Sequence, residues 1–287
     1  MDNKTIKSRG MFGDAWYRLR KNKLAIVGIG IMLIFLLAAI FAGYIAPYGY
    51  AEQHLDQIFL FPCKKHLLGT DNLGRDILSR IIYGARISLQ IGFVSVGIAL
   101  VIGSIIGCIS GFYGGKIDTV LMRLVDVMMA IPSVLLAIVI ASVLGTGMRN
   151  LMIAIGISSV PSFARIVRAS ILSVRDQEYI EAARLCGCSD FRIIMRHVFP
   201  NILPNIIVQV TLSMGLSILN AASLSFLGLG VQAPQPEWGS MLAAGRSYMQ
   251  QYWHLVVFPG VAIVLLVLAL NMIGDGLRDA LDPRMKR

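Results

Sequence analysis

The stretch Asp176-Gln-Glu-Tyr-Ile-Glu181-Ala-Ala-Arg-Leu-Cys-Gly187-Cys-Ser-Asp190-Phe-Arg-Ile-Ile-Met-Arg-His197-Val-Phe-Pro200-Asn-Ile-Leu-Pro204 is a charged island in an apolar chain. Its first half, about residues 178–186, is rich in helix formers and is followed by Gly187, the residue type that commonly ends a helix. A second helix is predicted to begin at Ser189 or Asp190 and to stop before Pro200. Two short helices joined by a glycine form a projection, which we expect to fit a groove on a partner.

The rest of the chain has the composition of a polytopic membrane protein. Of 287 residues, 56% are hydrophobic and only 15% are charged, and the mean hydropathy is +0.71. This composition leaves room for five to seven membrane spans with short loops and no large soluble domain. The net charge of +10 is explained by basic residues that flank spans, so no nucleic-acid partner is expected. The four cysteines predict neither a disulfide framework nor a metal site, because Cys186-x-Cys188 has only His197 nearby.

The apolar runs predict an all-α protein with six transmembrane helices. We place these helices at residues 24–45, 87–111, 118–144, 150–167, 206–229 and 252–273. Within the second run, Gly103, Gly107 and Gly111 recur every four residues and predict a flat face for close helix packing. Pro132 and Pro161 lie inside the third and fourth runs and are expected to kink them.

The distribution of basic residues predicts which side of the membrane each loop occupies. Most of the 26 Lys and Arg residues lie in the N-terminal segment, the second-to-third connection, the charged island and the C-terminal tail. Both termini and the island are therefore expected on the cytoplasmic side. Residues 1–23 combine basic side chains with apolar ones at helical spacing, which predicts an interfacial helix on the inner leaflet. The first apolar run is too long for a cleaved signal peptide, and the segment 46–86 after it is expected to be external.

The sequence shows no set of residues with which the chain would perform chemistry or supply energy. Gly111-Phe-Tyr-Gly-Gly-Lys116 is one residue short of a phosphate-binding loop and lacks the following Ser or Thr. The spans lack a chain of ionisable residues at mid-depth, which disfavours a self-sufficient secondary transporter or channel. An intramembrane enzyme is less favoured still, for want of a catalytic set. Arg123 and Asp126 are three residues apart on a predicted helix and are expected to pair with each other.

The charged island resembles the EAA loop of ABC-importer permeases. The matching pattern is Glu181-Ala182-Ala183-x₃-Gly187-x₉-His197-Val-Phe199-Pro200, in which His197 and Phe199 replace the family's usual Ile and Leu. The peptide-permease branch is similar in having His at this position. Three further stretches resemble that branch, at residues 66–89, 225–242 and 274–284. The likeness covers nearly the whole chain and is greatest to the C-type permease subunit of dipeptide, oligopeptide and nickel importers.

The resemblance implies a type I ABC-importer permease fold in a bacterial cytoplasmic membrane. A first helix at 24–45 and an external segment at 46–86 would precede a core at 87–287, with the EAA loop at 172–205 and a cytoplasmic tail at 274–287. It implies a non-catalytic subunit that binds no cofactor of its own and conducts peptides, with a nickel or metal-chelate substrate as the alternative. The implied partners are a homologous permease, two cytoplasmic ATPases that hydrolyse ATP with Mg, and an external solute-binding protein.

The same resemblance assigns roles to individual residues. The ATPase-docking residues would be Glu181, Ala182, Ala183, Gly187, Asp190, His197 and Pro200. Small side chains at Ala182 and Ala183 let a helix sit deep in a groove. The candidate contacts with the binding protein are Asp71, Arg75, Asp76 and Trp238.

Overall fold

The computed structural model describes residues 11–281, and within them nearly all regular structure is helical. The first half contains α1 (Met11–Leu19), α2 (Lys23–Ile40), α3 (Ala42–Ile45), α4 (Ile77–Tyr113), α5 (Gly115–Met129), α6 (Ser133–Leu144) and α7 (Met148–Leu172). The second half contains α8 (Glu178–Leu185), α9 (Asp190–Ile193), the π-helical segment η1 (Ile194–Val198), α10 (Phe199–Phe226), α11 (Trp238–Gly245), the 3₁₀ turn η2 (Arg246–Tyr248) and α12 (His254–Leu281).

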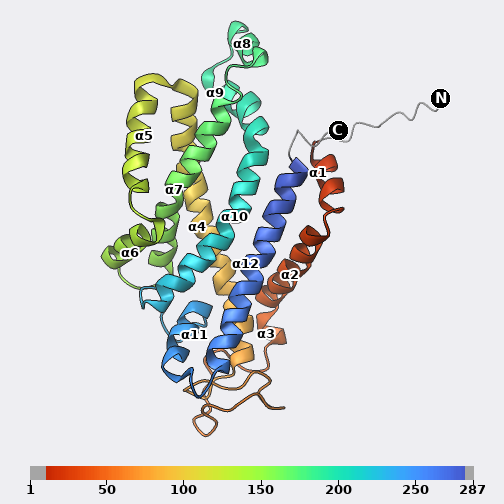
Figure 1. Ribbon diagram of the computed structural model, residues 1–287, viewed down its shortest axis with the longest axis vertical. Helices are drawn as coiled ribbons and strands as arrows, with labels where there is room; N and C mark the ends of the chain where they lie inside the picture. The colour runs from red at the N-terminus through yellow and green to blue at the C-terminus, as the bar shows by residue number, and fades with distance from the viewer. Residues whose placement is uncertain (1–10, 282–287) are drawn as a thin grey trace, which may run out of the picture.

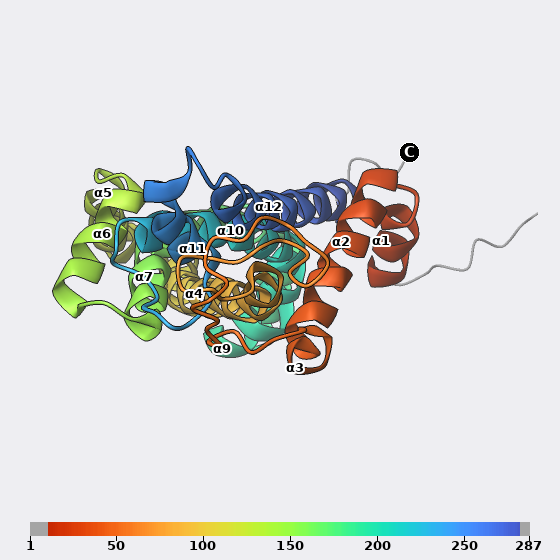
Figure 2. The same ribbon diagram turned by 90° about the horizontal axis from the view of Figure 1, so that it is seen from below.

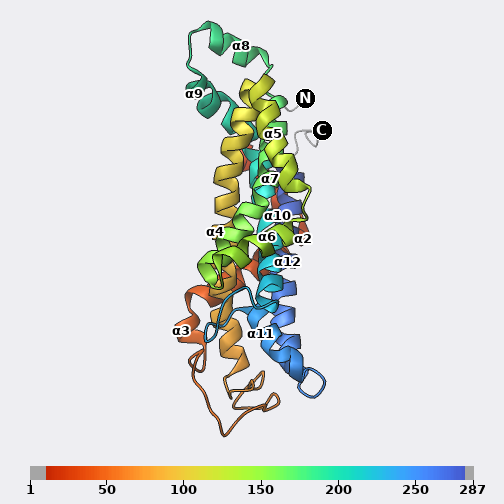
Figure 3. The same cartoon turned by 90° about the vertical axis from the view of Figure 1, so that its left-hand side faces the viewer.

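The long helices run side by side and give the molecule two distinct ends (Figure 1). One end carries α8, α9, α1 and the last turns of α12, and is called the α8 end. The other carries α11, α3 and the segment 46–76, and is called the α11 end. Seen from the α11 end, that segment loops across the ends of α4 and α11 (Figure 2). Figure 3 shows α8 lying across the opposite end.

The expectation of six spans is confirmed, with one of them broken. Five helical stretches are long and apolar enough to cross a membrane, namely α2, α4, α7, α12 and the continuous run Asp190–Phe226. The sixth is the pair α5 and α6, which meet at an angle of 87°. The break lies at Pro132, whose missing N–H and fixed φ of −52° end α5 and let a new helix begin at Ser133. The kink expected at this proline is therefore confirmed, whereas α7 continues as a helix through Pro161.

Two helices extend well beyond their predicted ends. The helix α4 begins at Ile77, ten residues before the expected start, because Asp76 caps it by accepting a hydrogen bond from Ser79 N at 2.7 Å. The helix α12 continues to Leu281 through Gly274 and Gly276, although a tail was predicted from residue 274. An added Cβ at Gly274 would lie 2.6 Å from Leu212 Cδ2, so these glycines admit close neighbours.

The glycine stripe on α4 packs directly against α7, as the spacing predicts. A Cβ at Gly103 would lie 2.5 Å from Phe163 Cβ, and one at Gly107 would lie 2.6 Å from Ala164 O. On the facing side, a Cβ at Gly156 would lie 2.8 Å from Ile98 Cβ. The two backbones therefore approach each other more closely than any side chain larger than hydrogen allows.

The helix expected in the basic N-terminal segment is present as α1, while residues 1–10 lie outside the described part. Its last residue, Leu19, is buried in a small cluster with Ala25 and Ala280. Asn22 caps the following helix by accepting hydrogen bonds from Leu24 N and Ala25 N. The helices α1 and α2 therefore pack against the part of α12 that lies toward the α8 end.

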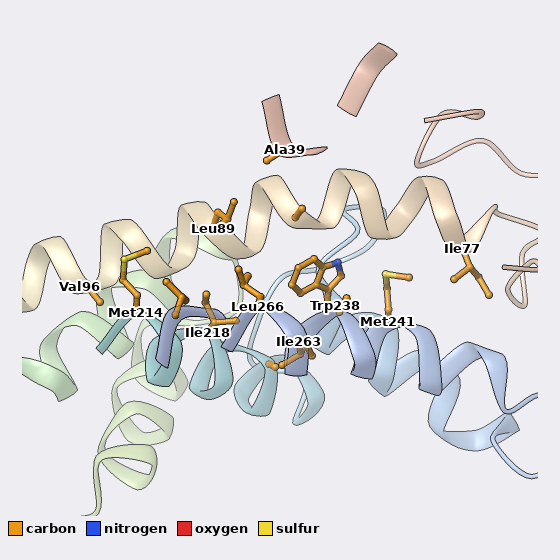
Figure 4. Packing of buried hydrophobic residues seen from close by; sticks show 14 of the residues in the cluster. Ala39, Ile77, Leu89, Val96, Met214, Ile218, Trp238, Met241, Ile263 and Leu266 are labelled. Atoms are coloured by element: carbon orange, nitrogen blue, oxygen red, sulfur yellow. The ribbon is translucent and has the colours of Figure 1, made fainter. Parts of the chain in front are cut away.

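The α11 end is organised around Trp238. This side chain is fully buried, and its Nε1–H donates to Ile81 O at 3.1 Å. Figure 4 shows it between α4 and α12, among Met241, Ile263 and Leu266. A Cβ at Gly84 would lie 2.5 Å from the indole nitrogen, so α4 leaves room for the ring only at a glycine.

Candidate functional site

The charged island forms the projection that its sequence predicts. The helix α8 ends in a Schellman motif, in which Cys188 N donates to Ala183 O at 3.1 Å and Gly187 N donates to Arg184 O at 2.9 Å. Gly187 has φ of +76°, which glycine adopts without the strain that a side chain would cause. The projection turns sharply there and presents both of its halves at the α8 end (Figures 1 and 3).

The projection has an inner and an outer face. Ile180, Ala183 and Ile193 are buried in a cluster with the ends of α4, α7 and α10. The outer face exposes Glu181, Ala182, Gly187 and Asp190. Two large apolar side chains lie exposed beside them: Leu185 is 90% exposed and Phe191 76% exposed.

This division separates the two alanines of the docking motif. Ala182 is on the outer face, where it is available to a partner. Ala183 lies at the contact between the projection and the bundle, so it anchors the projection instead of meeting a partner. Leu185 and Phe191 were not among the residues that the sequence assigned to docking. Their exposure on the outer face, which the sequence alone does not show, is what marks them as candidate contacts.

The second half of the projection does not stop before Pro200, contrary to the sequence-based expectation. The short α9 passes into η1 and then into α10 without a break in the helix. The wider turn of the π segment, which contains His197, changes the hydrogen-bond register just before Pro200. Pro200 follows shortly after this segment, so its missing N–H falls where the hydrogen-bond pattern of the continuous helix changes.

Several polar contacts fasten the projection to the bundle. Arg175, in the turn between α7 and α8, donates from Nη1 to Gly111 O at 2.9 Å. The Arg184 guanidinium lies 5.2 Å from the centre of the Phe112 ring. Asn201 Nδ2 donates to the Tyr179 hydroxyl at 3.2 Å, which links α10 back to α8. For Glu181 the described residues show no ion pair, so its carboxylate is left at the surface.

Two ion pairs hold α5 against α7 near the same end. Arg168 donates from Nε and Nη2 to the two carboxylate oxygens of Asp118, each at 2.6 Å. Ser110 donates to the same carboxylate. Arg165 Nη2 lies 2.5 Å from Asp126 Oδ1. The expected pair between Arg123 and Asp126 is therefore wrong, since the arginine of the neighbouring helix takes the carboxylate.

At the α11 end, three of the four candidate contacts with a binding protein are buried. Trp238 and Asp76 have almost no exposed surface, and Arg75 is 5% exposed. Asp76 caps α4 and accepts from His66 Nδ1 at 2.9 Å, while Arg75 Nε donates to Asp71 Oδ2 at 2.7 Å. These side chains hold the segment 46–76 on the bundle and leave little surface for another protein.

Two further buried charges at this end escaped the sequence analysis. Arg80 donates from Nη1 to Tyr50 O at 3.0 Å and faces Pro234 O at 3.4 Å, so it ties α4 to two connections. Glu237 caps α11 by accepting from Gly239 N and Ser240 N. Burial raises the pKa of the Glu237 carboxyl, and these hydrogen bonds oppose the rise. Neither Arg80 nor Glu237 lies in a sequence pattern that distinguishes a buried charged residue from an exposed one.

Among the residues that the structure describes, no three His, Cys, Asp or Glu side chains gather as metal ligands. The described cysteines are all free thiols, and Cys186 is exposed at the end of α8. The chemistry that the site offers is therefore that of a contact surface: two apolar side chains, a free carboxylate and a fixed turn.

Comparisons with known proteins agree with this architecture. A family model described as "Binding-protein-dependent transport system inner membrane component" matches residues 99–287. A second model, described as "N-terminal TM domain of oligopeptide transport permease C", matches residues 10–62.

Curated relatives match over most of the chain. The dipeptide transport system permease protein DppC of Alkalihalophilus pseudofirmus is 51% identical over 273 residues, which cover 95% of this chain and 90% of that protein. The di/tripeptide transport system permease protein DppC of Pseudomonas aeruginosa is 46% identical over 279 residues, covering 95% and 92%. The glutathione transport system permease protein GsiD of Pectobacterium atrosepticum is 45% identical over 275 residues, covering 95% and 91%.

Among solved structures, a chain of the MetNI methionine ABC transporter in an inward-facing conformation has a similar fold. The TM-score is 0.59 at 20% sequence identity, and the match covers 72% of this chain and 98% of that one. At this level of identity the likeness concerns the fold alone.

Proposed function

The chain belongs to the family of binding-protein-dependent transport system inner membrane components, and on this premise we propose that it conducts peptides across the membrane together with a homologous permease. It is a multi-pass inner-membrane permease of the ABC-transporter type. Separate ATPase subunits would supply the energy, and an external solute-binding protein would deliver the substrate.

Peptides are the substrate class that the relatives favour. Relatives at 51% and 46% identity are named for dipeptide and di/tripeptide transport, and one at 45% for glutathione transport. No feature of the described residues favours the nickel or metal-chelate alternative. The shared permease scaffold alone does not choose a substrate, so the proposal rests on these relatives.

The outer face of α8 and α9 is the proposed docking surface for an ATPase, and the observation that carries this assignment is the exposure of Leu185 and Phe191. These side chains project from the end of the bundle, and Ala182 is exposed on the same outer face. Large apolar side chains that lie exposed on one face beside charged residues are the kind of surface that a partner protein covers. In this arrangement the α8 end faces the cytoplasm, where ATP and Mg are bound by the partner.

The α11 end would then face the external binding protein. With Trp238 and Asp76 buried, the contact is better served by the open groove between the start of α7 and the connection before α11. This groove has a volume of about 490 Å³, and its polar lining consists of Thr146, Arg149, Asn150, Gln232 and Gln235. The residues that line this groove, called the binding-protein rim, are therefore the proposed contact, in place of the buried residues.

Reconstitution tests the function directly. The chain is assembled in proteoliposomes with its partner permease, ATPases and binding protein, and uptake of labelled alanyl-alanine is measured with and without ATP. The proposal expects uptake that needs ATP, the ATPases and the binding protein together. Uptake that continues without the ATPases would refute it, as would a complex that hydrolyses ATP in response to metal chelates and not to peptides.

A matched pair of variants tests the docking surface. Ala182→Glu places a charge on the outer face without disturbing the fold, so we expect the ATPases to be lost from the purified complex. Ala51→Glu adds the same charge at an exposed position of the segment 46–76, at the opposite end of the molecule, and serves as the control. Retention of the ATPases by Ala182→Glu would remove the outer face from the docking surface.

A further inference from the structure

An open cavity lies between α7, α10 and α12, toward the α8 end of the bundle. Its volume is about 470 Å³, within the range of roughly 300–1,000 Å³ that is usual for small-molecule sites. It is lined by Ile166, Pro204, Asn205, Val208, Gln209, Leu212, Arg278 and Leu281. No part of the docking surface or of the binding-protein rim contributes to it.

The polar residues of the cavity follow helical spacing along one side of α10. Asn205 and Gln209 are four residues apart, so their carboxamides lie one above the other. Asn205 Nδ2 donates to Ser170 Oγ at 3.1 Å, and Gln209 Nε2 donates to Ser213 Oγ at 3.0 Å. Each carboxamide nitrogen has a second N–H that remains available to a ligand.

The facing helix α12 carries a second polar residue, Asn271, nearer its middle than Arg278. Asn271 and Arg278 are seven residues apart and therefore lie on the same side of this helix. The side chain of Asn271 rests against α10 where that helix has no side chain, since a Cβ at Gly215 would lie 3.4 Å from Asn271 Oδ1. Gly215 and Asn271 are near the midpoints of their 28-residue helices.

Polar side chains within a span cost free energy when they face lipid and are usually turned to a path or a partner. A lipid headgroup would meet polar groups only near the end of the bundle, at Arg278. Asn271 lies two turns further along α12, nearer the middle of that helix, and does not line the cavity itself. A polar side chain at this place fits a path for a polar solute better than a headgroup site.

Arg278 gives the cavity a positive charge. No described carboxylate lies within ion-pair distance of its guanidinium, and the side chain is exposed. Asp275, one turn away on the same helix, does not neutralise it. A guanidinium beside two carboxamides is a donor set that matches a carboxylate, which it binds in a fork geometry.

We propose that this cavity is the exit section of the peptide path, and that Arg278, Asn205 and Gln209 bind the C-terminal carboxylate of the passing peptide. The inference rests on the proposed function, because a permease for peptides of varied side chains must recognise the features that all of them share. The carboxylate is one such feature. The cavity is also well placed, because α10 continues without a break from the proposed docking projection.

The test is the protection of an introduced cysteine in the assembled complex. Cys63, Cys108, Cys186 and Cys188 are replaced by Ser, and Val208→Cys, which lines the cavity without belonging to the carboxylate-binding set, is introduced. Inside-out vesicles are then treated with a charged, water-soluble thiol reagent in the presence of alanyl-alanine or of alanyl-alanine amide. Val264→Cys, on an exposed apolar part of α12, is the control for labelling at a lipid-facing position.

We expect Val208→Cys to react with the reagent and Val264→Cys to remain unlabelled. Alanyl-alanine should protect the cysteine at a concentration about tenfold lower than its amide does. Adding Arg278→Gln should remove this difference, and Arg278→Lys should keep most of it. Arg123→Gln, which removes an exposed charge of α5 away from the cavity, should leave it unchanged.

Three results would overturn the inference. An unreactive cysteine at position 208 would show that this face meets lipid. Equal protection by the acid and the amide would remove the carboxylate from the site, and a difference that survives Arg278→Gln would remove Arg278. In each case ATP-driven uptake of alanyl-alanine by the unaltered complex would still support the proposed function, so the two failures are distinguishable.

Discussion

Replacing Gly107 by alanine tests the contact between α4 and α7 on which the whole bundle depends. The new methyl group would lie 2.6 Å from Ala164 O, 2.8 Å from Val167 Cβ and 3.0 Å from Arg168 N. Two of these three atoms belong to the backbone of α7, so they cannot move aside as the end of a flexible side chain can. The helices must separate, or the local backbone must shift.

The magnitude follows from two opposing effects. Alanine favours a helix interior over glycine by about 0.8–1.0 kcal/mol. Overpacking a tight contact costs about 1–3 kcal/mol. Gly97, on the same helix, supplies a matched control because a Cβ there meets nothing within 4 Å. Gly97→Ala should therefore gain the helix preference alone, and the two variants should differ by about 1–3 kcal/mol.

Thermal unfolding of the purified chain in detergent measures this difference. For a protein of this size, a change of 1 kcal/mol moves Tm by about 2–4 °C. We expect Gly107→Ala to unfold several degrees below Gly97→Ala, and Gly30→Ala, where a Cβ also meets nothing, to resemble Gly97→Ala. Equal Tm values for Gly107→Ala and Gly97→Ala would refute the reasoning, because the close approach would then carry no energetic consequence.

Three further changes test other parts of the structure. Leu185→Asp should weaken ATPase binding about tenfold or more, since burying a Leu side chain in an interface contributes about 1.5–3 kcal/mol. If Leu185→Met and Leu185→Asp both leave ATPase binding unchanged, this side chain is not in the interface. Asp118→Asn should lower the free energy of unfolding by about 1 kcal/mol. The double variant Asp118→Arg with Arg168→Asp, which exchanges the two side chains, should regain part of this loss. A double variant no more stable than Asp118→Asn would contradict the pairing. Glu237→Gln tests the raised pKa of the Glu237 carboxyl. The stabilisation from the protonated carboxyl is complete below its usual pKa of 4.5 and is lost as the pH rises through the raised pKa, so the stability of the unaltered chain relative to the Gln variant should fall with rising pH. A difference in Tm between the two that does not depend on pH would count against the raised pKa.

The sequence predicted features that depend on periodicity and on single backbone positions. The apolar runs located the spans, the four-residue glycine spacing located the α4–α7 contact, and Gly187 located the turn of the projection. Each of these follows from local geometry that a helix or a turn imposes on its own residues. No knowledge of the neighbouring helices was needed to infer them.

The errors concern features that depend on neighbours. The last apolar run was predicted to end at residue 273 and to be followed by a charged tail. In the structure, packing of Gly274 against Leu212 stabilises this part of α12 and outweighs the low helix preference of glycine. Trp238 was assigned to an external contact by resemblance, yet its ring is buried where Gly84 of α4 makes room for it. Burial of this kind depends on residues more than a hundred positions apart.

The residues of the proposed path could not be grouped from the sequence for a similar reason. Asn205 and Gln209 are one turn apart on α10, but Arg278 lies beside them only because α10 and α12 run antiparallel. Single polar residues near the ends of apolar runs are common, and their type alone does not show whether they face water, lipid or protein. Their shared cavity is what gives them significance.

The helix that continues from the projection has a mechanical consequence. The run Asp190–Phe226 contains 37 residues, so at 1.5 Å per residue it forms a rod about 55 Å long. On its other side the projection joins α7 through the non-helical residues 173–177, among which Arg175 is hydrogen-bonded to Gly111 O of α4. Tilting such a rod by about 5° at one end displaces the other end by about 5 Å. A displacement of α9 would therefore be transmitted along α10 toward the α11 end, whereas Arg175 keeps the turn before α8 attached to α4.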